Sequence, residues 1–455
     1  MKTQKNKSRK NFYKKMERFT KKRKISLFQK KKIQGRIVSK KEGWKTIEIY
    51  GEPFDMGYAH GYLLWDDLRQ IKEMFPFMVY EDFKIPFSQY LEKSNVLIKP
   101  ILKSKYPDLY EEIRGIVVGA KKHGVIISTD FLISWNAYMS LYPIFEKNPK
   151  QRCSAFIATG NATKNGDIIM AHNTHAHFAE GRFFNIIMHL KPAKGFPFIM
   201  QISAGFVASI TDWFISGSGI IGTETTIAHT NYKPSFGSPF FCRIREAMQY
   251  GSTLDDYVNI MLKDNAGDYA CSWQFGNVNT GEIMLFELGL ENYHVQRTKN
   301  GVYYGMNSAI DFRLRTLETY DNNIFDPEKP NGSRNFRLNE LLNEKYYGEI
   351  SVDNAKTIIS DHFYSYLGKN QMNGRSICKH GESDTERQLV KPIGATDGKV
   401  VNTKMAKKME FLGRFGSSCG RTFYKDTFLK KYPEYEKWRP YLVDFPKTEW
   451  IRLGK

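Results

Sequence analysis

The sequence lacks the features that define several classes of protein. Its 455 residues contain no run of 18 uncharged apolar residues, so it predicts no transmembrane helix. The basic start, MKTQKNKSRKNFYKKMERF, has neither the apolar stretch nor the small-residue cleavage site of a secretory signal. We therefore expect a protein that acts inside a cell or is packaged inside a particle.

Cysteine is scarce and its spacing is irregular. The number of cysteines is odd, and no two of them form a Cys-x-x-Cys pair. This argues against a disulfide framework and a zinc ribbon, and it fits a reducing compartment. We expect free thiols, no metal site and no cofactor. The cysteines are Cys153, Cys242, Cys271, Cys378 and Cys419.

Acidic residues are almost absent from the first 40 residues. Residues 1–40 hold 17 Lys/Arg and one acid, Glu17, which gives this arm a charge of +16 and leaves 20 − 16 = +4 for the rest. Like charges at this density predict a disordered polybasic arm. Apolar residues between the charges leave three interpretations open: a solubilising tail, a nucleic-acid contact, or a contact with an anionic membrane surface.

Residues 41–152 are expected to form a helix-rich segment after one short strand. Apolar residues alternate along Trp44–Tyr50, which predicts the strand. A helix is predicted from Pro107, with Gly124 as its stop, and a further helix with Thr129 as its N-cap.

From Cys153 onward the pattern changes to short strands. Apolar and aromatic runs on either side of Asn279–Gly281 predict one hairpin, and those around Asn300–Gly301 predict another. Helical patterns return between the strands. We therefore predict that residues 153–455 form an α+β core with helices layered over stacked antiparallel sheets.

Cys153 is the strongest candidate for a nucleophile. It begins a strand after a polar stretch, and a polar cluster, His172–His175, follows about twenty residues later. A thiol must lose its proton to attack, and a cysteine at a chain N-terminus carries its own base, an α-amine with a pKa near 8. Attack of the thiol on the preceding peptide bond would cut the chain between Arg152 and Cys153. Nearby Asn and Thr side chains can stabilise the oxyanion.

The length of one loop decides whether the polar cluster reaches this thiol. A two-residue turn at Asn165–Gly166 would place Cys153 opposite Phe178. If the whole stretch Gly160–Asp167 is the loop, Cys153 lies opposite Thr174 and beside Asn173. We predict the longer loop.

Other interpretations of these residues stay open. A single cysteine in an apolar strand is usually a packed core residue. The run His-Asn-Thr-His-Ala-His resembles a metal motif, but on a strand His175 and His177 share one face while His172 points to the other. We therefore predict no zinc site there. Glu224 suits a structural role as well as a catalytic one.

Several segments resemble known families. CSAFIATGNATKNGDIIMAHNTH looks like the nucleophile strand of phospholipase B-like (lamina ancestor) proteins, and TDWFISGSGIIGTETTI and YYGMNSA look like two further signatures. The preceding GEPFDMGYAHG, EEIRGIVVGAKKHG and LISWNAYMSLY resemble the isopenicillin N acyltransferase relatives. Both groups are N-terminal-nucleophile (Ntn) hydrolases. The resemblance extends from about Trp44 to Ala309.

The resemblance implies a four-layer αββα sandwich, cleavage between Arg152 and Cys153, and Cys153 as the nucleophile. In the phospholipase B-like pattern His175 replaces a Trp, and Cys271-Ser272-Trp273-Gln274 stands where Asn-Asn-Gln-Trp is found. We also expect an aromatic acyl pocket that includes Trp213, Phe214, Trp273 and Phe275. The implied catalytic residues are Cys153, His172, Asn173, Thr174 and an oxyanion-hole Asn231, and the implied site-lining residues are His175, Trp213, Ser272, Trp273 and Asn307.

The function implied by the resemblance is hydrolysis of acyl ester or amide bonds of phospholipids or other lipids. Two alternatives remain. One is an acyltransferase or amidase of the penicillin acyltransferase type, because acyl transfer shares the acyl-enzyme step. The other is a degenerate packaging protein whose basic arm binds nucleic acid.

Overall fold

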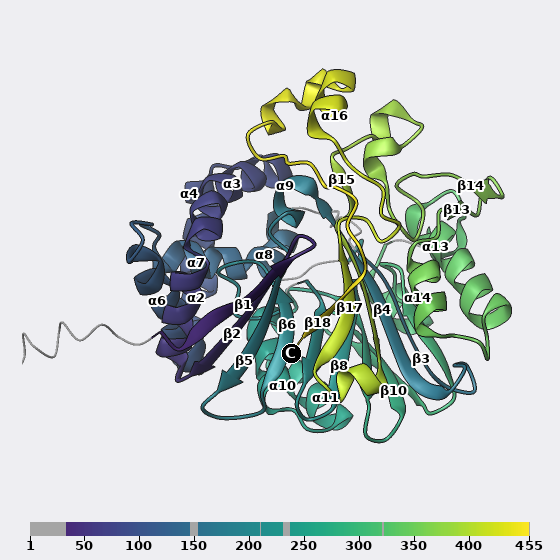
Figure 1. Cartoon of the computed structure of the whole chain (residues 1–455), viewed down its shortest axis with the longest axis horizontal. Helices are drawn as coiled ribbons and strands as arrows, with labels where there is room; N and C mark the ends of the chain where they lie inside the picture. The colour runs from purple at the N-terminus through teal and green to yellow at the C-terminus, as the bar shows by residue number, and fades with distance from the viewer. Residues whose placement is uncertain (1–32, 146–152, 210, 231–236, 321–322, 455) are drawn as a thin grey trace, which may run out of the picture. The chain divides into compact units, whose positions relative to one another are not determined.

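The computed structural model describes residues 33–145, 153–209, 211–230, 237–320 and 323–454, which form a mixed α+β structure (Figure 1). A helix-rich segment lies between the first two strands and the rest of the sheets. Its helices are α2 (Pro53–Leu63), α3 (Trp65–Phe83), α4 (Phe87–Leu97), α5 (Lys99–Lys105), α6 (Pro107–Lys121), α7 (Thr129–Asn136) and α8 (Tyr138–Phe145).

The larger sheet has nine strands, and its neighbours are antiparallel except for the parallel pair β2 and β5. Because β2 precedes the helical segment and β5 follows it, the two halves of the chain share this sheet. In spatial order the strands are β1 (Gly35–Lys41), β2 (Trp44–Gly51), β5 (Ile186–Pro192), β6 (Phe198–Ile202), β7 (Trp213–Ser216), β8 (Ile220–Thr226), β9 (Cys271–Asn277), β10 (Glu282–Leu288) and β11 (Tyr293–Thr298).

The second sheet has seven strands and carries Cys153 at the start of β3. Its order is β12 (Gly301–Gly305), β3 (Cys153–Gly160), β4 (Gly166–His177), β16 (Asp397–Asn402), β17 (Glu410–Phe415) and β18 (Ile451–Gly454), with β15 (Ile393–Ala395) paired to the end of β4. A separate two-stranded sheet joins β13 (Phe363–Tyr364) to β14 (Lys369–Asn370).

The remaining α-helices follow strand β4 along the chain. They are α9 (Phe178–Gly181), α10 (Phe240–Tyr250), α11 (Leu254–Leu262), α12 (Phe312–Glu318), α13 (Pro330–Asn339), α14 (Val352–Ile359), α15 (Thr403–Ala406) and α16 (Lys425–Lys431).

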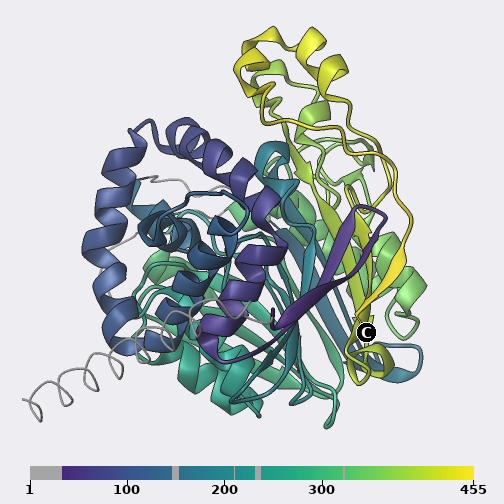
Figure 2. The ribbon, with the colours of Figure 1, turned by 60° about the vertical axis from the view of Figure 1, so that its left-hand side comes forward.

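The two large sheets face each other (Figure 2). A buried apolar core lies between them. Ile157 and Met170 of the seven-stranded sheet pack there against Ile215 and Ile221 of the nine-stranded sheet. Alternate residues of β3 and β4 point the other way and pack against α13 and α14. On the far side of the nine-stranded sheet, Tyr257 of α11 stacks on Phe214 at 5.7 Å between ring centroids.

Helices α2 and α6 approach each other so closely that only glycine fits at the crossing. A Cβ atom at Gly57 would lie 1.8 Å from the carbonyl oxygen of Glu112, and one at Gly61 would lie 2.0 Å from that of Ile116. Gly115 and Gly119 are equally close to α2 from the other side. These glycines are the Gly-x-x-x-Gly pairs of GYAHG and GIVVG, so the sequence itself encodes the backbone contact.

Two predictions of local structure are wrong. Residues 35–40 were expected in the disordered arm, but they lie in β1, whose backbone hydrogen bonds to β2 while Arg36 pairs with Glu48 at the surface. The rest of the predicted arm, apart from residues 33 and 34, lies outside the described residues. The predicted hairpin at Asn300–Gly301 does not form either, because β11 pairs with β10 in one sheet and β12 pairs with β3 in the other.

Two other predictions of local structure are confirmed, and a third is one residue off. The strand over Trp44–Tyr50 is β2, and the hairpin around Asn279–Gly281 joins β9 to β10. The N-cap of α7 is one residue earlier than expected, since the Ser128 hydroxyl, and not that of Thr129, accepts from the backbone of Phe131.

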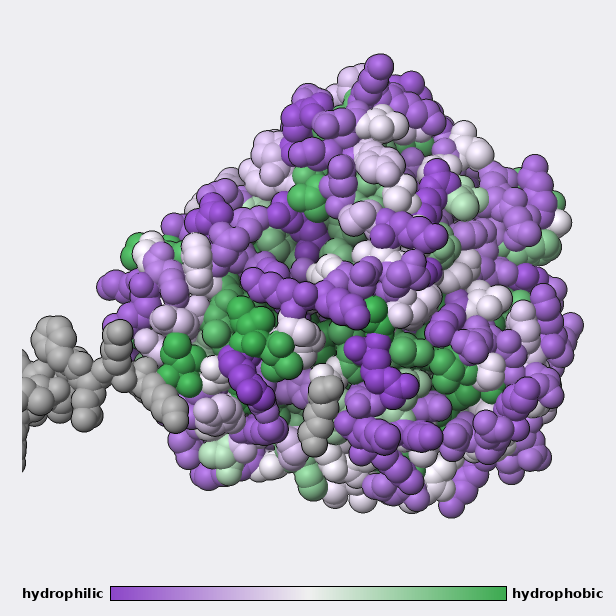
Figure 3. Space-filling model, viewed as in Figure 1, coloured by the Kyte–Doolittle hydropathy of each residue, from purple (hydrophilic) through white to green (hydrophobic). Residues whose placement is uncertain are grey.

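Apolar side chains are concentrated in the interior. Figure 3 shows one face on which hydrophilic side chains surround and interrupt the apolar patches. Within the described ranges, every helix is too short or too polar to cross a membrane.

Candidate active site

Cys153 is the first residue of β3 and is 1% exposed. It pairs with Thr174 of β4, and Ser154 pairs with Asn173. This register is the predicted one, but the loop is shorter than Gly160–Asp167, because the strands extend to Gly160 and from Gly166, which pair with each other. The polar cluster of β4 therefore lies beside the thiol, as the sequence predicts.

The two faces of the sheet divide this cluster. Directly paired residues point to the same side, so Cys153, His172 and Thr174 face the space between the large sheets. Asn173 and His175 point to the opposite side. There Asn173 Nδ2 donates to the carbonyl oxygens of Ile359 (2.6 Å) and Ile377 (3.2 Å), and His175 Nε2 lies 3.1 Å from the latter. The Asn173 and His175 side chains thus support the strand from behind.

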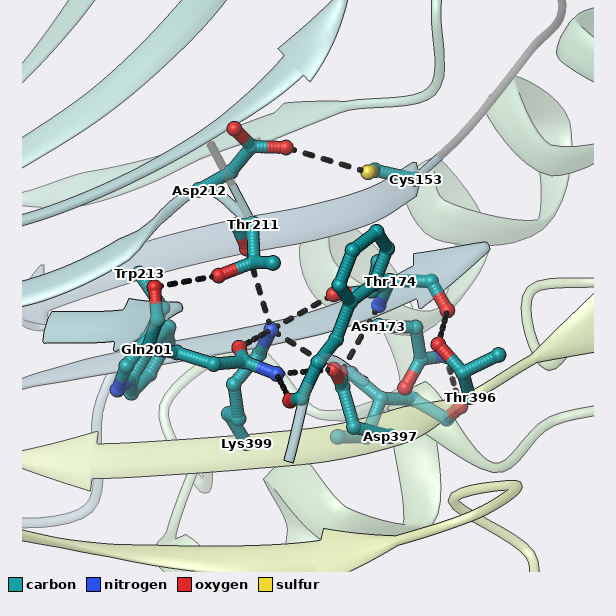
Figure 4. Close-up of polar contacts among 12 residues, drawn as sticks. Cys153, Asn173, Thr174, Gln201, Thr211, Asp212, Trp213, Thr396, Asp397 and Lys399 are labelled. Carbon is teal, nitrogen blue, oxygen red and sulfur yellow. Dashed lines mark hydrogen bonds and ion pairs between the residues drawn. The ribbon is translucent and has the colours of Figure 1, made fainter. Parts of the chain in front are cut away.

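Each polar atom of Cys153 has a buried partner. Its backbone N–H donates to Asn307 Oδ1 at 3.2 Å, and its Sγ lies 3.6 Å from Asp212 Oδ2 (Figure 4). Its carbonyl oxygen accepts from Arg334 Nη1 at 2.5 Å. Three side chains from distant segments therefore converge on one residue.

Arg334 and Asn307 hold each other as well as Cys153. Arg334 is buried, and its guanidinium donates to Asn307 Oδ1 at 3.0 Å and to Ser154 Oγ at 3.1 Å. Burial lowers the pKa of Arg334 to about 9. Asn307 Nδ2 donates in turn to the carbonyl oxygen of Thr226, which ties the site to β8 of the facing sheet.

The electrostatics keep the thiol neutral until a base acts on it. Burial raises the pKa of Cys153 well above its usual value, and the negative charges of Asp212 and Glu224 raise it further. Lys399 and the backbone amide of His175 oppose this shift. Burial also holds the pKa of His172 well below its usual value, so that ring is neutral at pH 7. The Asp212 carboxylate accepts the hydrogen bond of the thiol.

A second polar network lies next to Thr174 (Figure 4). Lys399 Nζ donates to Thr174 Oγ1 at 2.8 Å and to Gln201 Oε1 at 2.6 Å, and it pairs with Asp397 Oδ1 at 3.0 Å. Asp397 also accepts from the backbone of Thr174 and from Gln201. Burial lowers the pKa of Lys399, and Asp397 counters that effect. The network fixes a cation close to the nucleophile strand.

The expected aromatic pocket does not form as predicted. Trp213 faces the core between the sheets, with Lys399 Nζ 5.9 Å from its ring centroid. Trp273 lies on the opposite face of the nine-stranded sheet and stacks on Phe275 at 5.0 Å, while Phe214 packs on Tyr257. The prediction is wrong because alternate residues of a strand point to opposite faces, which puts Trp213 on one face of the sheet and the other three rings together on the opposite face.

The other residues singled out in the sequence do not all lie at Cys153. Ser272 Oγ lies 3.4 Å from Glu287 Oε1 in the interior. Asn307 is in the site. Arg152 and Asn231 lie outside the described residues. Glu224 accepts from the Tyr269 hydroxyl at 2.7 Å.

Three donor atoms at the site lie close enough to share a metal ion. Those of Cys153, His172 and Asp212 are within 4.8 Å of one another. The three histidines of His-Asn-Thr-His-Ala-His are not brought together: His177 Nε2 lies 3.6 Å from Asp82 Oδ1, away from His172.

Sequence reasoning missed Asp212, Arg334, Asp397 and Lys399. Asp212 lies inside the segment TDWF that carries the second signature. The sequence shows the acid there but does not indicate that it lies beside Cys153. Arg334 is separated from Cys153 by 181 residues and has no local pattern to mark it.

A cavity lies beside the site. Its lining includes His229, Pro330, Arg375 and Lys379. Arg334 Nε donates to the carbonyl oxygen of Pro330 at 2.9 Å, so the guanidinium that binds Cys153 also contacts the cavity wall.

Comparison with known proteins gives distant relatives. No family model matches the chain. Over 250 residues, 51% of the chain, it is 26% identical to an uncharacterized protein of Archaeoglobus fulgidus, and this match covers 41% of that relative. Over 240 residues, 47% of the chain, it is 21% identical to protein dcd1B of Dictyostelium discoideum, with 44% of that protein covered. The chain thus matches less than half the length of either relative.

Proposed function

We propose that this chain is an Ntn hydrolase of the phospholipase B-like type, which cuts itself between Arg152 and Cys153 and then hydrolyses acyl ester or amide bonds of lipids. The observation that carries the proposal is the set of contacts at Cys153: Asn307 Oδ1 on its backbone nitrogen and Asp212 Oδ2 at its sulfur. Any buried backbone N–H needs a partner, but a packed core cysteine does not need a carboxylate at its sulfur.

The arrangement of layers supports the proposal. Two sheets pack face to face, α13 and α14 cover one outer face, and α10 and α11 lie against the other. These layers are compatible with the αββα order that an Ntn hydrolase would have. Cys153 begins β3, as the proposed nucleophile of such an enzyme would begin its strand.

Self-cleavage requires a base, an attack and a hydrolysis step. The Asp212 carboxylate accepts the thiol proton, and the thiolate attacks the carbonyl carbon of Arg152. The C–N bond to Cys153 then breaks, and the proton held by Asp212 passes to the leaving nitrogen. Water hydrolyses the resulting thioester. The products are an Arg152 carboxylate and a Cys153 with a free α-amine and thiol.

Turnover uses the new α-amine as the base. Asn307 Oδ1 holds this nitrogen beside the thiol, from which the amine takes the proton. The thiolate attacks the acyl carbonyl, the amine returns the proton to the departing alcohol or amine, and a thioester remains. Water then releases the fatty acid and regenerates the thiol. The fixed Lys399 cation favours the negative charge that develops nearby.

The test is the intact mass of the purified full chain. Wild type is expected as two pieces, residues 1–152 and 153–455, and Cys153→Ala as a single chain. Cys271→Ala, which alters another buried cysteine, serves as the matched control and should be cut. A wild-type chain that stays whole after long incubation at neutral and acidic pH would contradict self-cleavage.

The cleaved protein then allows a test of substrate class. Fatty-acid release from phosphatidylcholine and from an N-acyl amide, measured with and without an added amine acceptor, distinguishes ester hydrolysis, amide hydrolysis and acyl transfer. Activity on none of these, in a protein that has cut itself, would rule out the lipid substrates but leave the nucleophile in place.

A further inference from the structure

Two cysteines and two histidines converge at a place far from Cys153 in the sequence. His362 follows α14, Cys378 and His380 lie before β15, and Cys419 follows β17. One ring nitrogen or sulfur from each lies within 4.8 Å of the other three. Both cysteines are free thiols.

The distances in this group match tetrahedral coordination. The Sγ atoms of Cys378 and Cys419 lie 3.5 and 3.4 Å from His380 Nε2. Bonds of about 2.3 Å to sulfur and about 2.0 Å to nitrogen around one tetrahedral zinc ion separate the two donor atoms by about 3.5 Å. A donor set of two thiolates and two imidazoles is also the set that zinc prefers.

Hydrogen bonds outside the group orient its donor atoms. His380 Nδ1 lies 2.9 Å from Glu382 Oε1, so the carboxylate accepts a hydrogen bond from Nδ1–H and the Nε2 lone pair faces the two sulfurs. A histidine held in this way by a carboxylate is typical of zinc ligands. The backbone N–H of Arg421 donates to Cys419 Sγ at 3.4 Å, a contact that stabilises a thiolate.

Hydrogen bonding alone explains the group poorly. With its proton on Nδ1, His380 offers one lone pair, and two sulfurs lie within reach of it. His362 Nε2 is buried and makes no hydrogen bond among the described residues. A single cation between the four side chains could accept one lone pair from each of them.

The surrounding chain has little regular structure. Residues 360–392, between α14 and β15, hold only the two-residue strands β13 and β14 and two short 3-10 turns. A connection of this length with so little regular structure is uncommon within a folded domain. The four side chains join this segment to the end of α14 and to the chain beyond β17.

The group also lies behind the candidate active site. The carbonyl oxygen of Ile377, next to Cys378, accepts from Asn173 and lies 3.1 Å from the His175 ring on β4. Ser418, next to Cys419, donates to the carbonyl oxygen of Ile359, which Asn173 also contacts. Fixing Cys378 and Cys419 therefore fixes the partners that support the strand opposite Cys153.

We propose that His362, Cys378, His380 and Cys419 bind one zinc ion with tetrahedral geometry, and that the ion holds the segments behind β4 in place. All four positions are occupied by protein, so the site is structural. The proposal does not depend on hydrolase activity.

The test begins with the full chain purified without chelator. Metal analysis is expected to give one zinc per chain. Exchange with cobalt should give the visible bands of a tetrahedral ion and a thiolate charge-transfer band. Cys378→Ser and Cys419→Ser should each weaken or abolish these bands, whereas Cys242→Ser, a buried cysteine outside the group, should keep them.

A milder variant separates metal binding from folding. Glu382→Gln leaves the four ligands intact and should lower zinc affinity about 10- to 100-fold, measured by competition with a chelator. If the cysteine variants fail to fold, wild type and Glu382→Gln still decide the question. A wild-type protein that takes up neither zinc nor cobalt, or one in which Cys378 and Cys419 form a disulfide after purification, would overturn the proposal.

Discussion

The Oδ1 atom of Asn307 lies 3.2 Å from the backbone nitrogen of Cys153 and accepts its hydrogen bond. The same oxygen accepts from Arg334 at 3.0 Å, and Asn307 Nδ2 donates to β8. One amide therefore fixes the position of the nitrogen that is to become the catalytic amine. Its loss should affect chemistry more than folding if the proposed function is right.

Asn307→Gly tests this directly. Asn307 has φ +76°, so glycine removes the side chain without adding backbone strain. Self-cleavage and turnover are expected to slow about 100-fold, because the amine and thiol lose their fixed geometry. The rates come from the intact mass over time and from fatty-acid release. Asn300→Gly, at an exposed turn, is the control, and an equal slowing in both variants would argue against a specific role.

Asp212→Asn should slow self-cleavage about 100- to 10,000-fold, because the amide cannot take the thiol proton. The same change removes a negative charge that raises the Cys153 pKa. Alkylation of the Cys153 thiol should therefore begin at a lower pH than in a reference chain that keeps Asp212 and is also uncut. Asn307→Gly, if it leaves the chain uncut, provides that reference. Asp353→Asn, on the surface of α14, is the control for charge. Cleavage at the wild-type rate in Asp212→Asn would exclude Asp212 as the base.

Glu287 predicts a pH dependence of stability. Burial raises its pKa to about 7, from an ordinary value of 4.5. Between these values the unfolded chain has lost the proton that the folded chain retains, so this residue's contribution to stability is complete below pH 4.5 and declines as pH rises toward 7. The free energy of unfolding of Glu287→Gln, relative to that of wild type, should therefore rise by about 2 to 3 kcal/mol from pH 5 to pH 8. Urea unfolding at both pH values measures the difference, and a constant difference would contradict the assignment.

Gly57→Ala should destabilise the protein by about 3 kcal/mol or more, because the new methyl group meets backbone that cannot move away easily. The free energy of unfolding in urea is the measurement. Lys121→Ala, at an exposed position of α6, should change it little. A Gly57→Ala protein of wild-type stability would mean that α2 and α6 can separate at no cost.

The sequence predicted the site best where the information is local. The pairing of Cys153 with Thr174 followed from one loop, since only its longer form brings polar residues to the thiol. Alternation along β4 also gave the separation of His172 from His175. Arg334 could not be predicted, because its contact with Cys153 depends on how α13 packs against β3.

The cysteine spacing did not predict the group of His362, Cys378, His380 and Cys419, for a related reason. The absence of a Cys-x-x-Cys pair excludes a ribbon-like zinc site, but it does not exclude one assembled from separate segments. Cys378 and Cys419 are 41 positions apart and meet only through the tertiary fold. The hairpin predicted at Asn300–Gly301 failed similarly, because a turn signal does not say which strand each arm will pair with.

The parallel pairing of β2 with β5 has a consequence for the life of the processed protein. Its seven residue pairs, from Lys45 with Ile186 to Gly51 with Pro192, join chain from either side of the proposed cut. After cleavage these pairs hold two separate polypeptides in one sheet, so the pieces should remain together under native conditions. Refolding after denaturation then becomes a second-order reaction that slows with dilution, whereas the uncut Cys153→Ala chain refolds at a rate independent of concentration. The mature form would thus be persistent once made but difficult to rebuild.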